Sequence, residues 1–84
     1  MRDTIRFDTP ITQRQLDALS FISEFIDQRG YAPSIREITN YFGYRSTRSA
    51  ADLVLALDVK GYISVARGIS RGIRLTPKHA QKAA

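Results

Sequence analysis

The chain has no cysteine and a single histidine, His79. Without cysteine there can be no disulfide framework, no thiolate zinc site and no cysteine nucleophile. One histidine in a polar segment, with no cluster of carboxylates or thiolates around it, is not a metal site either. We therefore expect no metal and no other cofactor, and we interpret His79 as a solvated side chain.

Long apolar runs are also missing. No run approaches the roughly 20 residues that a membrane-spanning helix needs, and the N-terminus lacks the apolar core of a signal peptide. The sequence has no paired carboxylates and no nucleophile beside a base. These absences predict a cytoplasmic protein that is not an enzyme, has no membrane partner and takes no small-molecule substrate.

The charge that is present is unevenly distributed. The 84 residues carry a net charge of +5, and a chain of this length forms one small domain. Residues 43–84 hold eight basic and two acidic side chains, whereas residues 1–42 hold five basic and six acidic ones. Such one-sided charge favours a polyanionic partner. The alternative is a basic surface without a partner, because net charge alone does not specify one.

Two capping boxes mark the starts of two helices. Thr12 is followed three residues later by Gln15, and an apolar stripe at helical spacing then runs from Leu16 to Ile26. Ser34 is followed in the same way by Glu37, and the second helix is short. We expect the first helix to end before Gly30 and the second at Gly43.

A third helix and a hairpin follow. Ser46 is placed as the N-cap of a helix that Gly61 closes, and its core stripe is Ala50, Leu53, Val54 and Leu57. Residues 62–66 and 73–75 are β-prone and flank a glycine turn at 67–70. A lone hairpin is only marginally stable, so it must pack on the helices, with four candidates for contact: Ile63, Val65, Ile73 and Leu75.

This element order predicts a mainly α fold with a small β hairpin, a three-helix winged helix-turn-helix. We expect a flexible N-terminal arm at residues 1–11, the DNA-binding domain at 12–76 and a polar C-terminal tail at 77–84. A helix-turn-helix presents the first turns of its second helix to base edges in the major groove of double-stranded DNA. The candidates for base reading are therefore Ser46, Thr47, Arg48, Ser49, Ala51 and Asp52.

Arg48 and Asp52 point away from the core stripe of this helix. Arg48 can donate two hydrogen bonds to guanine, Asp52 can accept from cytosine, and Ser49 suits either role. The alternative for Arg48 and Asp52 is a surface ion pair one helical turn apart.

The wing supplies the expected phosphate contacts. Arginine side chains suit phosphate, and glycines reduce bulk where a wing must fit beside the duplex. The candidates are Arg45, Arg67, Gly68, Arg71, Gly72 and Arg74. The exposed amides of residues 46–49 offer a further phosphate site at the helix N-terminus. For the wing alone, a solvated basic turn is an equally plain interpretation.

Several segments together carry a resemblance to a known family. They are Thr12-x-x-Gln15, Ala32-Pro33-Ser34-x-x-Glu37-Ile38, Phe42-Gly43-Tyr44-Arg45-Ser46, Lys60-Gly61 and, above all, Ser70-Arg71-Gly72-Ile73-Arg74-Leu75. From Thr12 to Leu75 the chain resembles the N-terminal DNA-binding domain of LexA, the SOS-response repressor family. The resemblance implies a winged helix-turn-helix that binds operator DNA and represses transcription, in a bacterial, phage or mobile-element setting at the nucleoid.

The chain departs from this family at the base-reading turn. Where the family typically carries Asn, Ala, Glu and Glu, this sequence has Arg48, Ser49, Ala51 and Asp52, and Ser46 alone is kept. We therefore hypothesise that the chain does not prefer the family's usual CTG-type half-site and that Arg48 shifts the preference toward guanine.

LexA-like repressors also carry a C-terminal domain with a serine–lysine dyad, which cleaves the linker and holds the dimer. The 84 residues do not include it, so self-cleavage by them is not expected. One recognition helix covers one half-site, and operators usually pair two, so a homodimer would need another contact.

Leu55 and Val59 are candidates for a partner surface. They lie opposite the core stripe, where LexA-like chains tend to place lysine or arginine. The alternatives are that the arm covers them through Ile5, Phe7 or Ile11, or that Leu55 touches a thymine methyl. The leading functional hypothesis is thus a DNA-binding repressor, and the alternative is an adaptor that binds and modulates another repressor or transcription protein.

Overall fold

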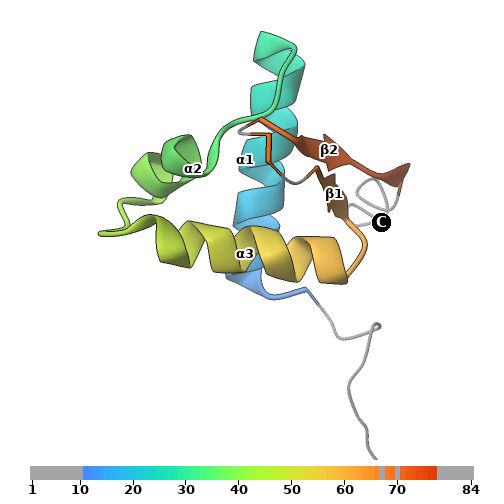
Figure 1. The fold of residues 1–84 in the computed structure, drawn as a ribbon. Helices are drawn as coiled ribbons and strands as arrows, with labels where there is room; N and C mark the ends of the chain where they lie inside the picture. The colour runs from blue at the N-terminus through green and yellow to red at the C-terminus, as the bar shows by residue number, and fades with distance from the viewer. Residues whose placement is uncertain (1–10, 67, 70, 78–84) are drawn as a thin grey trace, which may run out of the picture.

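The computed structural model describes residues 11–66, 68–69 and 71–77 (Figure 1). Three helices, α1 (Gln13–Arg29), α2 (Ile35–Phe42) and α3 (Thr47–Val59), precede two strands, β1 (Ile63–Val65) and β2 (Ile73–Leu75). Helix α3 passes in front of α1, with α2 on one side and the hairpin on the other (Figure 1). The predicted mainly α, winged helix-turn-helix architecture is confirmed. Residues 1–10 of the expected arm, Arg67, Ser70 and residues 78–84 of the expected tail lie outside the described residues.

Both predicted capping boxes are formed. At the start of α1, the Thr12 hydroxyl accepts from the Gln15 amide at 3.1 Å and the Gln15 side chain accepts from the Thr12 amide at 3.2 Å. At the start of α2, Ser34 and Glu37 make the equivalent pair of bonds, at 3.1 and 2.9 Å. Each box satisfies amides that have no partner inside their own helix, which fixes where the helix begins.

Helix α3 begins and ends differently. Ser46 occupies its N-cap position, as predicted, but the Ser46 hydroxyl makes no capping hydrogen bond. At the other end, the Gly61 amide bonds to the Asp58 carbonyl and the Tyr62 amide bonds to the Leu57 carbonyl, each at 3.0 Å. This is a Schellman motif, which needs a left-handed residue, and Gly61 has φ 88°. It also explains why β1 starts at Ile63 and not at Tyr62, whose amide is used by the helix end.

The core lies where the three helices and the hairpin meet. Leu19, Ile22 and Ile38 from the first two helices are fully buried together with Leu57 of α3, and Ala18 joins them. The hairpin pairs Ile63 with Leu75, Ser64 with Arg74 and Val65 with Ile73. All four predicted hairpin contacts are confirmed: Ile63 and Ile73 are buried, and Val65 and Leu75 pack against the core. Ile11, which was assigned to the arm, also packs against this core.

Candidate nucleic-acid interface

The outward side of α3 is exposed along its whole length. Ala50, Val54 and Leu57 face the core, so the opposite side of the helix carries Arg48, Asp52, Leu55 and Val59 in succession. The first two turns of this side are polar and the next two are aliphatic. The helix therefore presents two chemically different surfaces side by side.

The predicted base-reading residues come together on the polar half. Every one of them is exposed: Ser46, Thr47, Arg48, Ser49, Ala51 and Asp52. Arg48 and Asp52 make no ion pair or side-chain hydrogen bond within the part of the chain that the structure describes. The alternative of a surface ion pair is thus not formed, while contact with bases remains a prediction.

The N-terminus of α3 is open, in contrast to α1 and α2. Because the Ser46 hydroxyl makes no capping bond, the amides of the first turn of α3 lack the side-chain acceptor that the two capping boxes provide elsewhere. Such amides, together with the helix dipole, favour an anion at this end of the helix. The exposed Arg45 lies in the adjacent turn.

The turn between α2 and α3 is braced from α1. Arg14 donates from Nη1 to the Tyr44 hydroxyl at 2.9 Å, and Tyr44 stacks on Phe42 with ring centroids 5.6 Å apart. The Tyr44 amide also bonds to the Thr39 carbonyl at 3.1 Å. Sequence reasoning missed this brace, because Arg14 and Tyr44 are 30 residues apart and no local spacing connects them.

The two wing glycines differ in their surroundings. Gly68 is exposed in the turn with φ 76°, and a side chain there would meet open space. A Cβ on Gly72 would lie 2.7 Å from the Ala66 carbonyl oxygen and 3.2 Å from that of Ile69. Glycine is thus required at position 72 because the two sides of the hairpin turn lie close together there. This requirement does not depend on the presence of DNA.

Arg74 and Arg71 also differ. Arg74 is exposed beside Ser64, on the face of the hairpin away from the buried Ile63 and Ile73, and is available to a phosphate. Arg71, which was expected to contact phosphate, has other partners in the structure. Its Nη1 donates to Glu37 Oε1 at 2.6 Å and to the Ala32 carbonyl at 2.9 Å, and its Nη2 donates to Glu37 Oε2 at 3.0 Å.

The Arg71 guanidinium also lies 4.7 Å from the centre of the Tyr31 ring. The hydrogen bonds from Arg71, with a further bond from the Ser34 amide, lower the pKa of the Glu37 carboxyl to about 2. Glu37 is therefore ionised at neutral pH, and the Arg71–Glu37 pair has no net charge. The geometry makes Arg71 part of a link between the wing and α2.

The same arrangement occurs at the other capping box. Gln15 Oε1, which caps α1, also accepts from Lys60 Nζ at 2.6 Å, across 45 residues of sequence. In each box the side chain at the third helical position thus accepts hydrogen bonds from two groups. One is the N-cap amide of its own helix and the other is a distant basic side chain. The capping pattern identified Gln15 and Glu37, but nothing in the sequence signalled their second partners.

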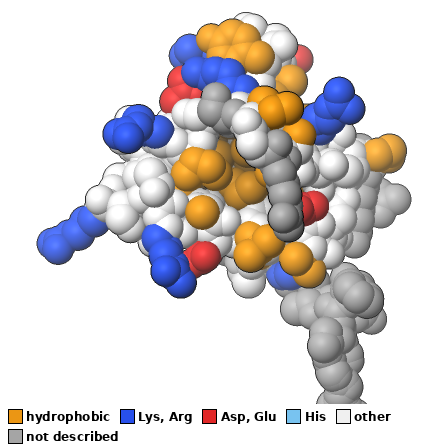
Figure 2. All heavy atoms as spheres, in the orientation of Figure 1, with side chains coloured by type: hydrophobic (Ala, Val, Ile, Leu, Met, Phe, Trp, Pro, Cys, Tyr) orange, Lys and Arg blue, Asp and Glu red, His pale blue; other side chains and the backbone are white. Residues whose placement is uncertain are grey.

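The aliphatic half of α3 borders a shallow depression. Leu55 and Val59 are 59% and 60% exposed, so neither Ile11 nor any other described segment covers them. Ile5 and Phe7 lie outside the described residues. Leu55, Ala51 and Val65 help to line the depression, which measures about 270 Å³. Figure 2 shows hydrophobic side chains gathered at the middle of this face, with lysine and arginine around its edge.

Comparison with known proteins places this fold in a family. Residues 8–72 match the model of the LexA DNA binding domain, a span that includes α3 and the hairpin turn. The chain belongs to the LexA DNA-binding domain family.

Several LexA repressors are similar to it over most of its length. The repressor of Petrotoga mobilis is 39% identical over 71 residues, which is 84% of this chain and 34% of that protein. That of Hahella chejuensis is 42% identical over 71 residues, 84% of this chain and 36% of the relative. That of Halorhodospira halophila is 43% identical over 70 residues, 83% and 31% respectively. The chain thus spans about a third of the length of these relatives.

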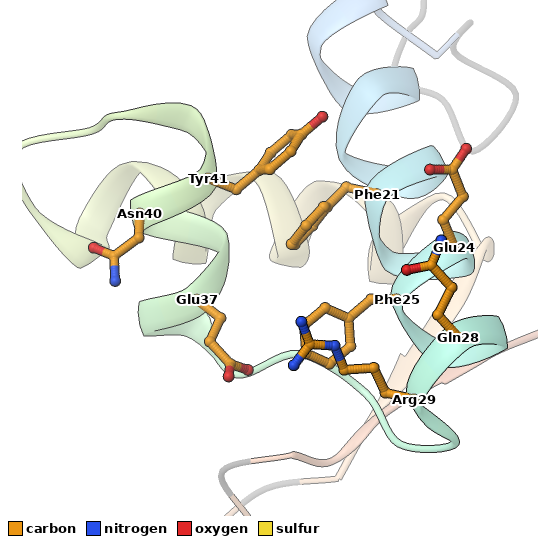
Figure 3. A pocket seen from close by; sticks show the side chains of 8 residues that line it. All are labelled: Phe21, Glu24, Phe25, Gln28, Arg29, Glu37, Asn40 and Tyr41. Atoms are coloured by element: carbon orange, nitrogen blue, oxygen red, sulfur yellow. The ribbon is translucent and has the colours of Figure 1, made fainter.

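One further hollow in this LexA-family domain lies between α1 and α2 (Figure 3). It measures about 500 Å³ and is lined by Phe21, Glu24, Phe25, Gln28, Arg29, Glu37, Asn40 and Tyr41. No predicted base-reading residue lines it. Within the described ranges there is no group of three or more metal-ligating side chains and no helix long and apolar enough to cross a membrane.

Proposed function

We propose that the chain is a sequence-specific double-stranded DNA-binding regulator of the LexA type that represses transcription by occupying its operator. The observation that carries the proposal is the open first half of α3. Its exposed polar side chains and uncapped amides lie together on one surface, and in a helix-turn-helix this surface enters the major groove. Family membership supports the same role.

We further propose that the operator preference differs from that of most LexA proteins. Arg48 has no partner among the described residues, so its guanidinium is available for a bidentate contact with guanine O6 and N7. Asp52, one turn later, can accept from cytosine N4. A turn with arginine and aspartate at these positions offers a different set of donors and acceptors from one with asparagine and glutamate.

Two copies are expected on one operator, because a single recognition helix covers one half-site. We propose the exposed Leu55 and Val59 as part of the contact with the second copy. Burial in this contact would remove the apolar surface of both side chains from water. Neither side chain carries a charge that could contact a phosphate.

Selection of bound sequences from a random duplex pool tests the proposal. Two half-sites at a fixed spacing, with guanine enriched at the position that loses its preference in Arg48→Ala, would support it. Competition between the selected site and a CTG-type LexA operator then measures the altered preference. An undiminished preference for the LexA operator would contradict that part, and the absence of any enriched sequence would contradict sequence-specific binding.

The exposed aliphatic surface also favours the second candidate, an adaptor that binds another repressor or transcription protein. Salt dependence separates the two functions. A DNA binder loses affinity linearly on a log–log plot against salt, with a slope set by its phosphate contacts. An adaptor would show no salt-dependent DNA complex and would co-elute with a transcription protein.

A further inference from the structure

We infer that Arg71 is a positioning residue, which fixes the wing to the helix-turn-helix, and that other residues make the phosphate contacts of the wing. The inference rests on the proposed function in so far as the wing acts on DNA. It assigns a role to the arginine that begins the segment Arg71-Gly72-Ile73-Arg74, which most strongly resembles the LexA family.

The hydrogen-bonding capacity of Arg71 is largely used inside the domain. Nη1 has two hydrogens, and both are donated, one to the Glu37 carboxylate and one to the Ala32 carbonyl. Nη2 gives a hydrogen to the second oxygen of Glu37. A phosphate would have to displace a carboxylate that already holds the guanidinium through two parallel bonds, which is the strong geometry for this pair.

The charge of Arg71 is also neutralised locally. Binding of DNA gains from the release of counterions when unpaired cations meet phosphates. Because the Arg71–Glu37 pair has no net charge, it offers little to that gain. Arg74, which has no acidic partner among the described residues, remains the cation that suits a phosphate.

The location of the contacts explains what the link does. Arg71 stands two residues before the start of β2, and its partners Ala32 and Glu37 lie in the α1–α2 turn and in the first turn of α2. The hairpin has only three residues in each strand, and such a hairpin needs external support. Arg71 therefore ties the turn side of the wing to the helix that packs on α3, and so sets the orientation of the wing relative to the recognition helix.

Four variants distinguish positioning from phosphate contact. Arg71→Ala removes the link. Arg71→Lys keeps the charge but loses the forked geometry and the stacking on Tyr31. Glu37→Gln keeps a side-chain oxygen that can cap α2 but removes the ionic partner. Arg74→Ala is the matched control for a wing arginine without the link.

Affinity for the selected site, measured across a salt series, gives the first readout. If Arg71 positions the wing, Arg71→Ala and Arg71→Lys each weaken binding about three- to tenfold with a wild-type salt slope, and Arg74→Ala lowers the slope by about one. Glu37→Gln also weakens binding, although it removes a negative charge. The inference is overturned if Arg71→Lys binds like wild type, Arg71→Ala lowers the slope by about one, and Glu37→Gln binds more tightly.

Amide hydrogen exchange of the hairpin gives a second readout that does not need DNA. The Ala66 and Thr76 amides bond across the hairpin to the Gly72 and Tyr62 carbonyls, at 3.0 and 3.2 Å. Faster exchange at these two amides in Arg71→Ala and in Glu37→Gln, with little further change in the double variant, supports the link. Wild-type exchange in both single variants overturns it. If the wild-type chain binds no DNA at all, the proposed function fails, and hydrogen exchange still decides the inference.

Discussion

Glu37 serves two partners at once, the amide that begins α2 and the guanidinium that holds the wing. Its side chain is 33% exposed and that of Arg71 39%, so solvent screens the pair in part. What distinguishes it from an ordinary surface ion pair is the number of bonds that share one carboxylate. A change in the ionisation of this single group reaches both the start of a helix and the position of the wing.

This coupling predicts a pH dependence of stability. The pKa of Glu37 is lowered from 4.5 to about 2, so its contribution to folding is fully present above pH 4.5 and is lost as the pH falls toward 2. We expect the free energy of unfolding, measured by chemical denaturation, to fall less between pH 5 and pH 2.5 in Glu37→Gln than in wild type. Identical pH profiles for the two proteins would show that Glu37 does not carry this effect.

Arg48 is the residue on which base preference is expected to depend most. Arg48→Ala should cost about 1–3 kcal/mol of binding free energy on the selected operator, as for loss of a bidentate base contact. Binding to a duplex of unrelated sequence should weaken much less, since the loss there is at most one cation near phosphates. Fluorescence anisotropy on the two duplexes measures both values. An equal loss on both would indicate a phosphate contact in place of base reading.

At the scale of elements, the helix starts and the second strand were predicted to the residue, and the first strand was not. Thr12, Gln15, Ser34 and Glu37 define local motifs whose hydrogen bonds span three residues, so sequence spacing is enough to locate them. The first strand starts one residue later than predicted because the end of α3 takes the Tyr62 amide. In the candidate site, too, the local features were predicted from the sequence and the long-range contacts were not.

The exposed face of α3 follows from helical periodicity and was identified correctly as a surface. The partners of Arg71 lie 34 and 39 residues away, so no spacing rule indicates them. The internal bracing by Arg14 and Lys60 was missed for the same reason.

Because the two sides of the hairpin turn lie close together, a methyl group added at Gly72 should lower the stability of the domain. Gly72→Ala would place Cβ 2.7 Å from the Ala66 carbonyl oxygen, and backbone atoms cannot move aside as a flexible side chain can. We expect a loss of about 1–3 kcal/mol in the free energy of unfolding, the range for overpacking. Ser64→Ala, an exposed change on the same hairpin, should stay within about 0.5 kcal/mol. Equal stability of the two variants in thermal denaturation would mean that the turn rearranges freely.

For the whole molecule, the outward side of α3 separates charge from apolar surface. Arg48 and Asp52 mark the polar half, and Leu55 and Val59 leave the other half without a cation. The bound assembly should therefore depend on protein–protein contact as well as on phosphate contact. In the proposed dimer, Leu55 and Val59 of the two copies would supply such a contact.

The double variant Leu55→Lys/Val59→Lys tests this assembly. If these side chains contact a second copy, two lysines should weaken self-association at least tenfold, because they would place like charges in an apolar contact. Sedimentation velocity across a concentration series measures the change. Gln28→Lys/Asn40→Lys adds the same charge at exposed positions on α1 and α2 and is the matched control. Association that is unaltered in the first variant, or lowered equally in both, would remove the proposed contact.

The sharing of each capping side chain with a distant cation also has a kinetic consequence. The Gln15–Lys60 and Glu37–Arg71 bonds close loops of 45 and 34 residues, among the longest spans joined by side chains in the described part of the chain. Closing a long loop costs entropy before its contact forms, so such bonds tend to form after the rate-limiting step of folding. They then affect mainly the unfolding rate, and their loss should speed unfolding much more than it slows folding. The capping residues thus help their helices to form early in folding. Through their second partners they slow the unfolding of the folded domain.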